Sequence, residues 1–148
     1  MYKLRFNFKK TEKMETIKNM ILPLMLMCLI TSSATTKKFP VSTTVPTAEI
    51  TANVNMDKQK NFVIQITAKY LASVERLSPP KKTYVVWIVT KENGAKNIGL
   101  LNSKNAKKFT FETLSSFEPY EIFITAEDEG TISTPSGVEI SRVILKDF

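Results

Sequence analysis

Residues 84–89 read YVVWIV, and this stretch does most to decide the fold class. Every position is apolar and most are β-branched, a pattern that predicts a central β-strand covered on both faces. Trp87, the only tryptophan, lies in the middle of it. It is either an exposed aromatic platform for a sugar or peptide, or a core tryptophan packed between two sheets. Val85 and Val89 share its face and would bury it, so the core assignment is favoured.

Two period-two patterns precede this strand. Apolar and polar residues alternate over residues 48–56 and again over 62–69, with the polar turn DKQKN between them. Strict alternation predicts half-buried strands, and the short polar turn predicts that they form a hairpin. Residues 35–47, rich in Thr, Ser and Pro, predict a linker or an extended lead-in strand.

Further strand patterns follow it. Turn signals separate apolar or alternating segments at residues 97–101, 108–112, 120–126 and 138–145. Residues 70–77 have the only helix-like spacing, and we expect a short turn or loop there. About seven short strands of this kind predict an immunoglobulin-like antiparallel β-sandwich over residues 48–148. Its structural core is expected to include Tyr84, Trp87, Gly99 and Phe123.

The N-terminus has the order of a secretory signal. Residues 20–30 read MILPLMLMCLI; a lysine-bearing segment precedes them, and the small residues TSSA follow. We expect a signal-peptide helix in residues 1–34, cleaved after Ala34, with Met14 as an alternative start of translation. The chain is then exported, to the periplasm or outside the cell. A retained signal would instead anchor it on the outer side of the cytoplasmic membrane.

Cys28 allows a third outcome for the signal. A cysteine near the end of an apolar run is the residue that a bacterial lipoprotein modifies. Met27 stands where that processing prefers a small residue, so the favoured interpretation is a hydrophobe inside the signal. Cleavage after Ala34 leaves a mature chain without cysteine, and its fold would depend on the core alone.

Composition excludes several function classes. The 148 residues include no histidine and one cysteine, so there is no Ser-His-Asp triad, Cys-His pair or standard zinc site. We therefore predict a non-enzymatic protein without cofactor or metal. The acidic run of residues 127–129 has the oxygen ligands that calcium takes, but it lacks the spaced calcium-loop pattern, and a solvated turn is favoured.

The positive charge does not indicate a nucleic-acid partner. Six of the 21 basic residues but only two of the 14 acidic ones lie in residues 1–34. The remaining small clusters, such as Lys81–Lys82 and Lys107–Lys108, lack interleaved aromatic residues. They are interpreted as solvating residues that blunt sheet edges.

Four short motifs carry a family resemblance. The segments YVVW at 84–87, IGLL at 98–101, FITAE at 123–127 and TPSG at 134–137 resemble the extracytoplasmic C-terminal domain of anti-sigma-K factors, over roughly residues 84–140. The resemblance implies a sandwich on the outer side of the cytoplasmic membrane. The sigma-binding domain of that family has no counterpart here, so its best-known activity is not implied.

Three functional hypotheses follow. The first is an exported, non-enzymatic binding module of the bacterial envelope, whose partner is an envelope protein or glycan and which touches the membrane only through an uncleaved signal or a lipidated Cys28. The second is an accessory sensor that acts with a separate membrane anti-sigma factor. The third and most distant is a glycan hydrolase that uses only carboxylates, which would require two facing acids in a groove.

Overall fold

The computed structural model describes residues 34–92, 94–101 and 107–145. The predicted signal peptide, the alternative start at Met14 and Cys28 lie outside these residues. Ala34 is exposed and directly precedes the first strand. Among the described residues, no helix has the length and apolar character that crossing a bilayer requires.

The described chain is almost entirely β-structure. It forms eight strands and one short 3-10 helix, η1 (Val74–Arg76). The strands are β1 (Thr35–Lys38), β2 (Glu49–Met56), β3 (Phe62–Lys69), β4 (Thr83–Thr90), β5 (Gly94–Leu101), β6 (Lys108–Ser115), β7 (Glu121–Glu127) and β8 (Val138–Ile144).

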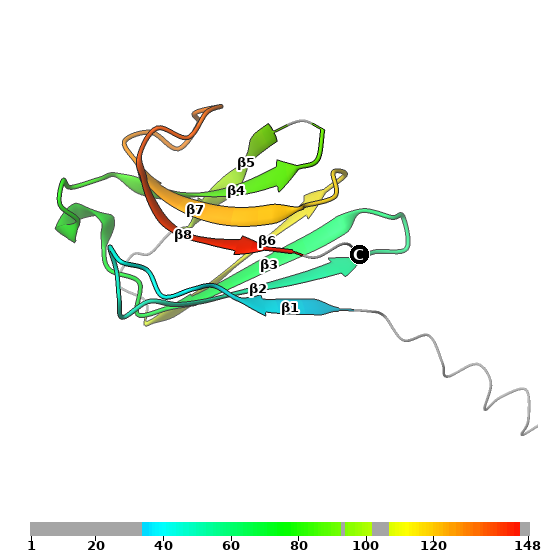
Figure 1. The fold of residues 1–148 in the computed structure, drawn as a ribbon, viewed down its shortest axis with the longest axis horizontal. Coiled ribbons are helices and arrows are strands. Elements are labelled where there is room, and N and C mark those ends of the chain that lie inside the picture. The colour runs from blue at the N-terminus through cyan, green and yellow to red at the C-terminus, as the bar shows by residue number, and fades with distance from the viewer. Residues whose placement is uncertain (1–33, 93, 102–106, 146–148) are drawn as a thin grey trace, which may run out of the picture. The chain divides into compact units, whose positions relative to one another are not determined.

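The strands form two four-stranded antiparallel sheets. Sheet A has the order β1-β2-β3-β6, and sheet B has the order β5-β4-β7-β8 (Figure 1). The predicted all-β antiparallel sandwich is confirmed, and the chain alternates between the sheets as in immunoglobulin-like folds. The β2–β3 hairpin forms with the predicted turn. β1, beside β2, is made by the segment expected to be a linker or lead-in strand.

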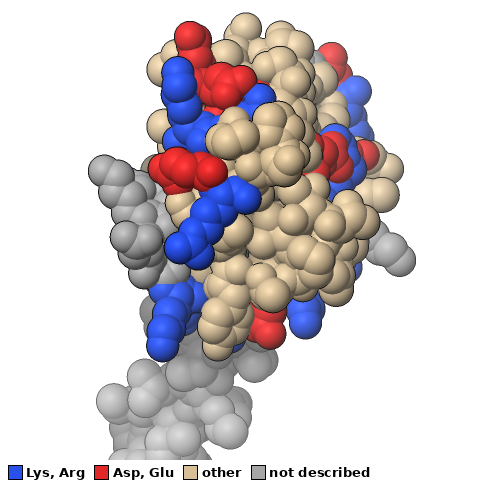
Figure 2. All heavy atoms as spheres, turned by 90° about the vertical axis from the view of Figure 1, so that its left-hand side faces the viewer, with Lys and Arg blue, Asp and Glu red and all other residues tan. Residues whose placement is uncertain are grey.

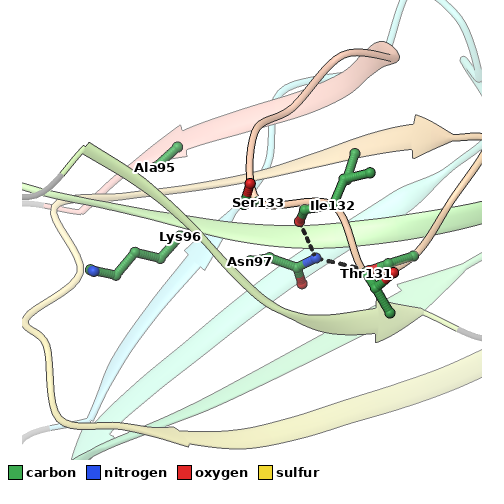
Figure 3. A pocket seen from close by; sticks show the side chains of 7 residues that line it. Ala95, Lys96, Asn97, Thr131, Ile132 and Ser133 are labelled. Atoms are coloured by element: carbon green, nitrogen blue, oxygen red, sulfur yellow. Dashed lines mark hydrogen bonds between the residues drawn. The ribbon is translucent and has the colours of Figure 1, made fainter.

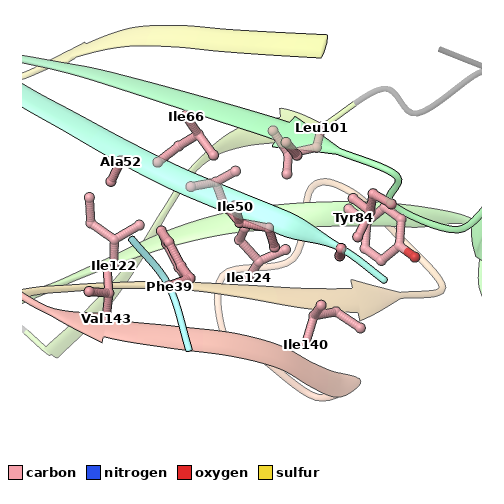
Figure 4. Packing of buried hydrophobic residues seen from close by; sticks show 14 of the residues in the cluster. Phe39, Ile50, Ala52, Ile66, Tyr84, Leu101, Ile122, Ile124, Ile140 and Val143 are labelled. Atoms are coloured by element: carbon pink, nitrogen blue, oxygen red, sulfur yellow. The ribbon is translucent and has the colours of Figure 1, made fainter. Parts of the chain in front are cut away.

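One hydrophobic core joins the sheets. The alternating apolar residues of β2 and β3 point inward, as period-two patterning requires, and meet inward residues of β4, β7 and β8 (Figure 4). Phe39, just after β1, enters the same core and is 4% exposed. Ser141 Oγ of β8 donates a hydrogen bond to the Pro40 carbonyl at 2.8 Å. The N-terminal segment therefore closes one side of the sandwich.

β4 is the predicted central strand, hydrogen-bonded to β5 and β7. Its alternate residues Tyr84, Val86 and Ile88 face the core between the sheets. Trp87 is fully buried, but it lies with Val85 in a separate cluster on the other face of sheet B. The expectation that Trp87 packs between the sheets is therefore wrong. An all-apolar strand does not show which face is the interior, because here a loop covers the outer face.

Candidate functional site

A small hydrophobic cluster lies on the outer face of sheet B. Trp87 of β4 stacks on Phe123 of β7, with ring centroids 5.9 Å apart and planes 10° apart. Ile132, in the loop of residues 128–137 that joins β7 to β8, packs against this pair. The Arg142 guanidinium lies over the Phe123 ring, 4.1 Å from its centroid. The outer face of sheet B is therefore a second, loop-covered layer.

A chain of hydrogen bonds fixes the β7–β8 loop to this cluster. The Trp87 indole donates to Thr125 Oγ1 at 2.8 Å, and that hydroxyl donates to Glu127 Oε1 at 2.7 Å. Glu127 also accepts bonds from the Ser136 backbone N–H at 3.2 Å and from the Ser136 hydroxyl at 3.1 Å. The loop is thus held by a carboxylate that is only 1% exposed.

The solvated-turn interpretation of residues 127–129 is wrong for Glu127. Thr125 and Glu127 have the same strand parity as Phe123, so all three point to the outer face under the loop. Asp128 and Glu129 are exposed, and Asp128 pairs with Lys81 at 2.8 Å. No group of three metal-ligating side chains occurs among the described residues. The alternation of side chains along β7, which places Glu127 on the same face as Phe123 and Thr125, is the sequence signal that could have identified this buried acid.

Beside the loop lies an open hollow of about 690 Å³. Ala95, Lys96 and Asn97 of β5 line one side, and residues 130–133 of the loop line the other (Figure 3). The Asn97 amide donates to the carbonyls of Gly130 and Ile132, at 2.8 and 2.9 Å. Its Oδ1 accepts the Gly99 N–H at 3.0 Å. Asn97 therefore fixes the width of the hollow.

A second hollow, of about 310 Å³, lies at the rim where β5 faces the end of β6. Lys96 lines both hollows, and its Nζ lies 4.4 Å from the Phe117 ring centroid. Lys96 is the charged residue in the two linings, and neither lining includes a carboxylate. The sequence analysis identified neither Lys96 nor Asn97. An asparagine inside a predicted strand could have indicated a special role for Asn97, because asparagine is uncommon in strands.

The other predicted core residues have structural roles. Tyr84 is fully buried and donates its hydroxyl proton to the Ala72 carbonyl at 2.9 Å. Burial raises the pKa of Tyr84 to about 12, and the charge of Glu75 adds to the effect. Gly99 has φ of 143°, and a Cβ there would lie 2.6 Å from the Phe111 ring. Only glycine fits this close approach of β5 to β6.

Charges are mixed where the loops gather. Figure 2 looks onto the end of the sandwich that carries the β7–β8 loop, and basic and acidic side chains alternate across it. Asp128 of the loop pairs with Lys81. Farther along β8, Arg142 binds both Glu139 and Glu121. The hydrogen bonds that the guanidinium donates to these carboxylates, Glu139 first, raise the pKa of Arg142 above its usual range. This end does not present the single-sign basic face typical of nucleic-acid binding.

No protein-family model, curated protein or solved structure matches this chain. The resemblance to anti-sigma-K C-terminal domains therefore stays a prediction. Residues of two of the motifs that carry the resemblance nevertheless contact one another, since Trp87, Thr125 and Glu127 belong to one hydrogen-bond network. The motifs describe how a loop is fixed to a sheet, and they specify no ligand.

Proposed function

We propose that this protein is an exported, non-enzymatic binding module of the bacterial envelope, and that the hollow between β5 and the β7–β8 loop holds its partner. The observation that carries the proposal is the rigid frame of that hollow. Asn97 holds its β5 side to the loop, and buried Glu127 holds the loop to the sheet. Binding sites are commonly loops positioned by a rigid scaffold in this way.

The lining suggests the chemistry of the partner. The hollow combines loop hydroxyls with the apolar side chain of Ile132, and the ammonium group of Lys96, which lines both hollows, lies over Phe117 at the second one. It is too open to enclose most of a small molecule, as sites for small ligands do. These features favour an extended segment of an envelope protein that crosses from this hollow to the second one and carries a carboxylate for Lys96. A glycan chain is the alternative partner.

Site-specific photo-crosslinking in the native host tests the proposal. A benzoylphenylalanine at Thr131, exposed in the hollow, is expected to form one discrete adduct on irradiation. The same group at Lys58, exposed in the β2–β3 turn, is the matched control and should not. Lys96→Glu should reduce the Thr131 adduct at least about tenfold by placing repulsion where the ion pair forms.

Mass spectrometry of the adduct identifies the partner class. An adduct with an envelope protein supports the favoured partner, and an adduct with a membrane anti-sigma protein supports the accessory-sensor alternative. An adduct with a glycan supports the glycan chain as the partner. Equal labelling from Thr131 and Lys58, or an adduct that Lys96→Glu does not change, would contradict the proposed site.

A further inference from the structure

The four edge strands of the sandwich are not equally protected against pairing with another chain. β1 is four residues long and carries two lysines. β5 has a register shift against β4 and Gly99 at φ of 143°. β8 has a register shift against β7, and the Pro40 segment binds its Ser141. Short length, charge and bulges are the usual devices that blunt edges.

β6 is neither short nor bulged, and its exposed charges, Lys108 and Glu112, have opposite signs. It pairs with β3 at eight consecutive positions without a register shift and contains neither proline nor glycine. No described strand pairs with its outer side. Its exposed residues are Lys108, Thr110, Glu112 and Leu114, while Phe109 and Phe111 point inward and are half-buried at the rim. β6 is therefore a regular edge available for strand addition.

The geometry points to a second copy of this chain as the occupant: we propose that two β6 strands pair antiparallel about a twofold axis at Thr110. Directly opposite residues on antiparallel strands point to the same face of the sheet. The twofold axis must therefore pass between the two copies of one residue. Centring on Thr110 places Lys108 opposite Glu112, Phe109 opposite Phe111, and Thr110 opposite itself. Opposite charges, aromatic pairs and threonine pairs are the favourable cross-strand combinations.

Neighbouring registers lose this complementarity. Centring on Phe111 places Lys108 opposite Leu114, and centring on Glu112 places two carboxylates opposite each other. Unpaired charge in the single chain supports the Thr110 register. Lys108 lies opposite Lys69 of β3, whose ammonium pairs with Glu49 at 3.6 Å. Lys108 itself has no ion pair with a described residue, and Glu112 Oε2 is engaged by neutral Gln65 at 3.0 Å.

Cysteine crosslinking in the exporting host tests the register. Opposite strand positions have Cα atoms about 4.5–5.5 Å apart, within disulfide range. Thr110→Cys in the full chain should give a disulfide-linked dimer at least about tenfold above the parent chain, which controls for Cys28. Leu114→Cys, on the same exposed face but beyond the paired residues, should not. A dimer yield for Thr110→Cys no higher than for the parent or for Leu114→Cys overturns the proposal.

Charge reversal tests the pairing independently. Each dimer contains the Lys108–Glu112 pair twice, so Lys108→Glu or Glu112→Lys alone should weaken dimerisation of the purified chain about tenfold in analytical ultracentrifugation. The double reversal should restore it, which general damage to the fold would not. Lys58→Glu makes the same change of charge away from β6 and should have no effect. A chain that stays monomeric, or a double variant no tighter than the single ones, overturns the proposal.

Discussion

At the scale of single residues, the buried carboxylate of Glu127 is the most informative side chain. It accepts hydrogen bonds from Thr125 and Ser136 away from solvent. Glu127→Ala leaves these donors without their acceptor, and we expect the free energy of unfolding to fall by about 2–4 kcal/mol. Urea unfolding followed by fluorescence measures this directly, because Trp87 is the only tryptophan and belongs to the same network.

The adjacent acid provides the control for Glu127. The Asp128 side chain is 62% exposed and its bond to Lys81 faces solvent. Asp128→Ala should therefore change the free energy of unfolding by less than about 1 kcal/mol. Equal losses for the two variants would mean that burial of Glu127 adds nothing to the stability of the loop.

Tyr84 gives the chain a predictable response to alkaline pH. Its pKa is raised to about 12 by burial and by Glu75, whereas an unfolded tyrosine titrates near pH 10. The folded state keeps the phenol proton longer, so the associated stability is fully present below about pH 10 and is lost as the pH rises toward about 12. The free energy of unfolding should fall over this window, and less steeply in Tyr84→Phe.

The same substitution has an effect at neutral pH. Tyr84→Phe removes the donor to the Ala72 carbonyl and should cost about 1 kcal/mol. Urea titrations at neutral pH and across the alkaline window compare the two chains. Parallel pH profiles for the parent and Tyr84→Phe would show that another group causes the alkaline loss.

At the scale of elements, the β7–β8 loop depends on one glycine. A Cβ at Gly137 would lie 1.9 Å from the Ala126 carbonyl oxygen and 2.6 Å from Glu127 Oε2. Gly137→Ala must displace the loop, and we expect a loss of about 2–3 kcal/mol. The displacement should also expose Trp87 and shift its fluorescence emission to longer wavelength.

Gly94 is the matched control in another turn. A Cβ at Gly94 meets no heavy atom within 4 Å, but its φ is +64°. Gly94→Ala should cost about 1–2 kcal/mol through backbone strain alone, with Trp87 emission unchanged. An unchanged emission in Gly137→Ala as well would contradict the role of Gly137 in seating the loop.

The sequence locates these strands more accurately than it shows which face of each strand lies in the core between the sheets. Period two located β2, β3, β6 and β7, and the all-apolar run located β4, because both patterns follow from strand geometry. The prediction that both faces of β4 are covered was correct. The layer that covers the Trp87 face, however, is the β7–β8 loop and not a second sheet. Loop packing of this kind has no periodic signature. For the same reason Asn97, whose partners are carbonyls more than thirty residues later in the chain, was not identified.

At the scale of the whole molecule, the sandwich is held together by its hydrophobic core. Residues from both sheets and from the Phe39 segment form one cluster, and the chain's only cysteine, Cys28, lies outside the described residues. The Trp87 cluster is attached to the outer face of the same sheet B. Because β4 contributes to both clusters, loss of the central core should unfold the outer layer with it.

Ile64→Ala tests this coupling across the sandwich. Ile64 is fully buried on β3 of sheet A, and truncating it should cost about 2–5 kcal/mol. The far-UV circular dichroism and the Trp87 fluorescence should still change in one coincident urea transition, as expected of a single cooperative unit. Val63→Ala, on the opposite face of the same strand and half-buried, should cost about 1 kcal/mol. Separate transitions for the two signals would mean that the loop-covered layer of sheet B folds independently of the core, although β4 belongs to both.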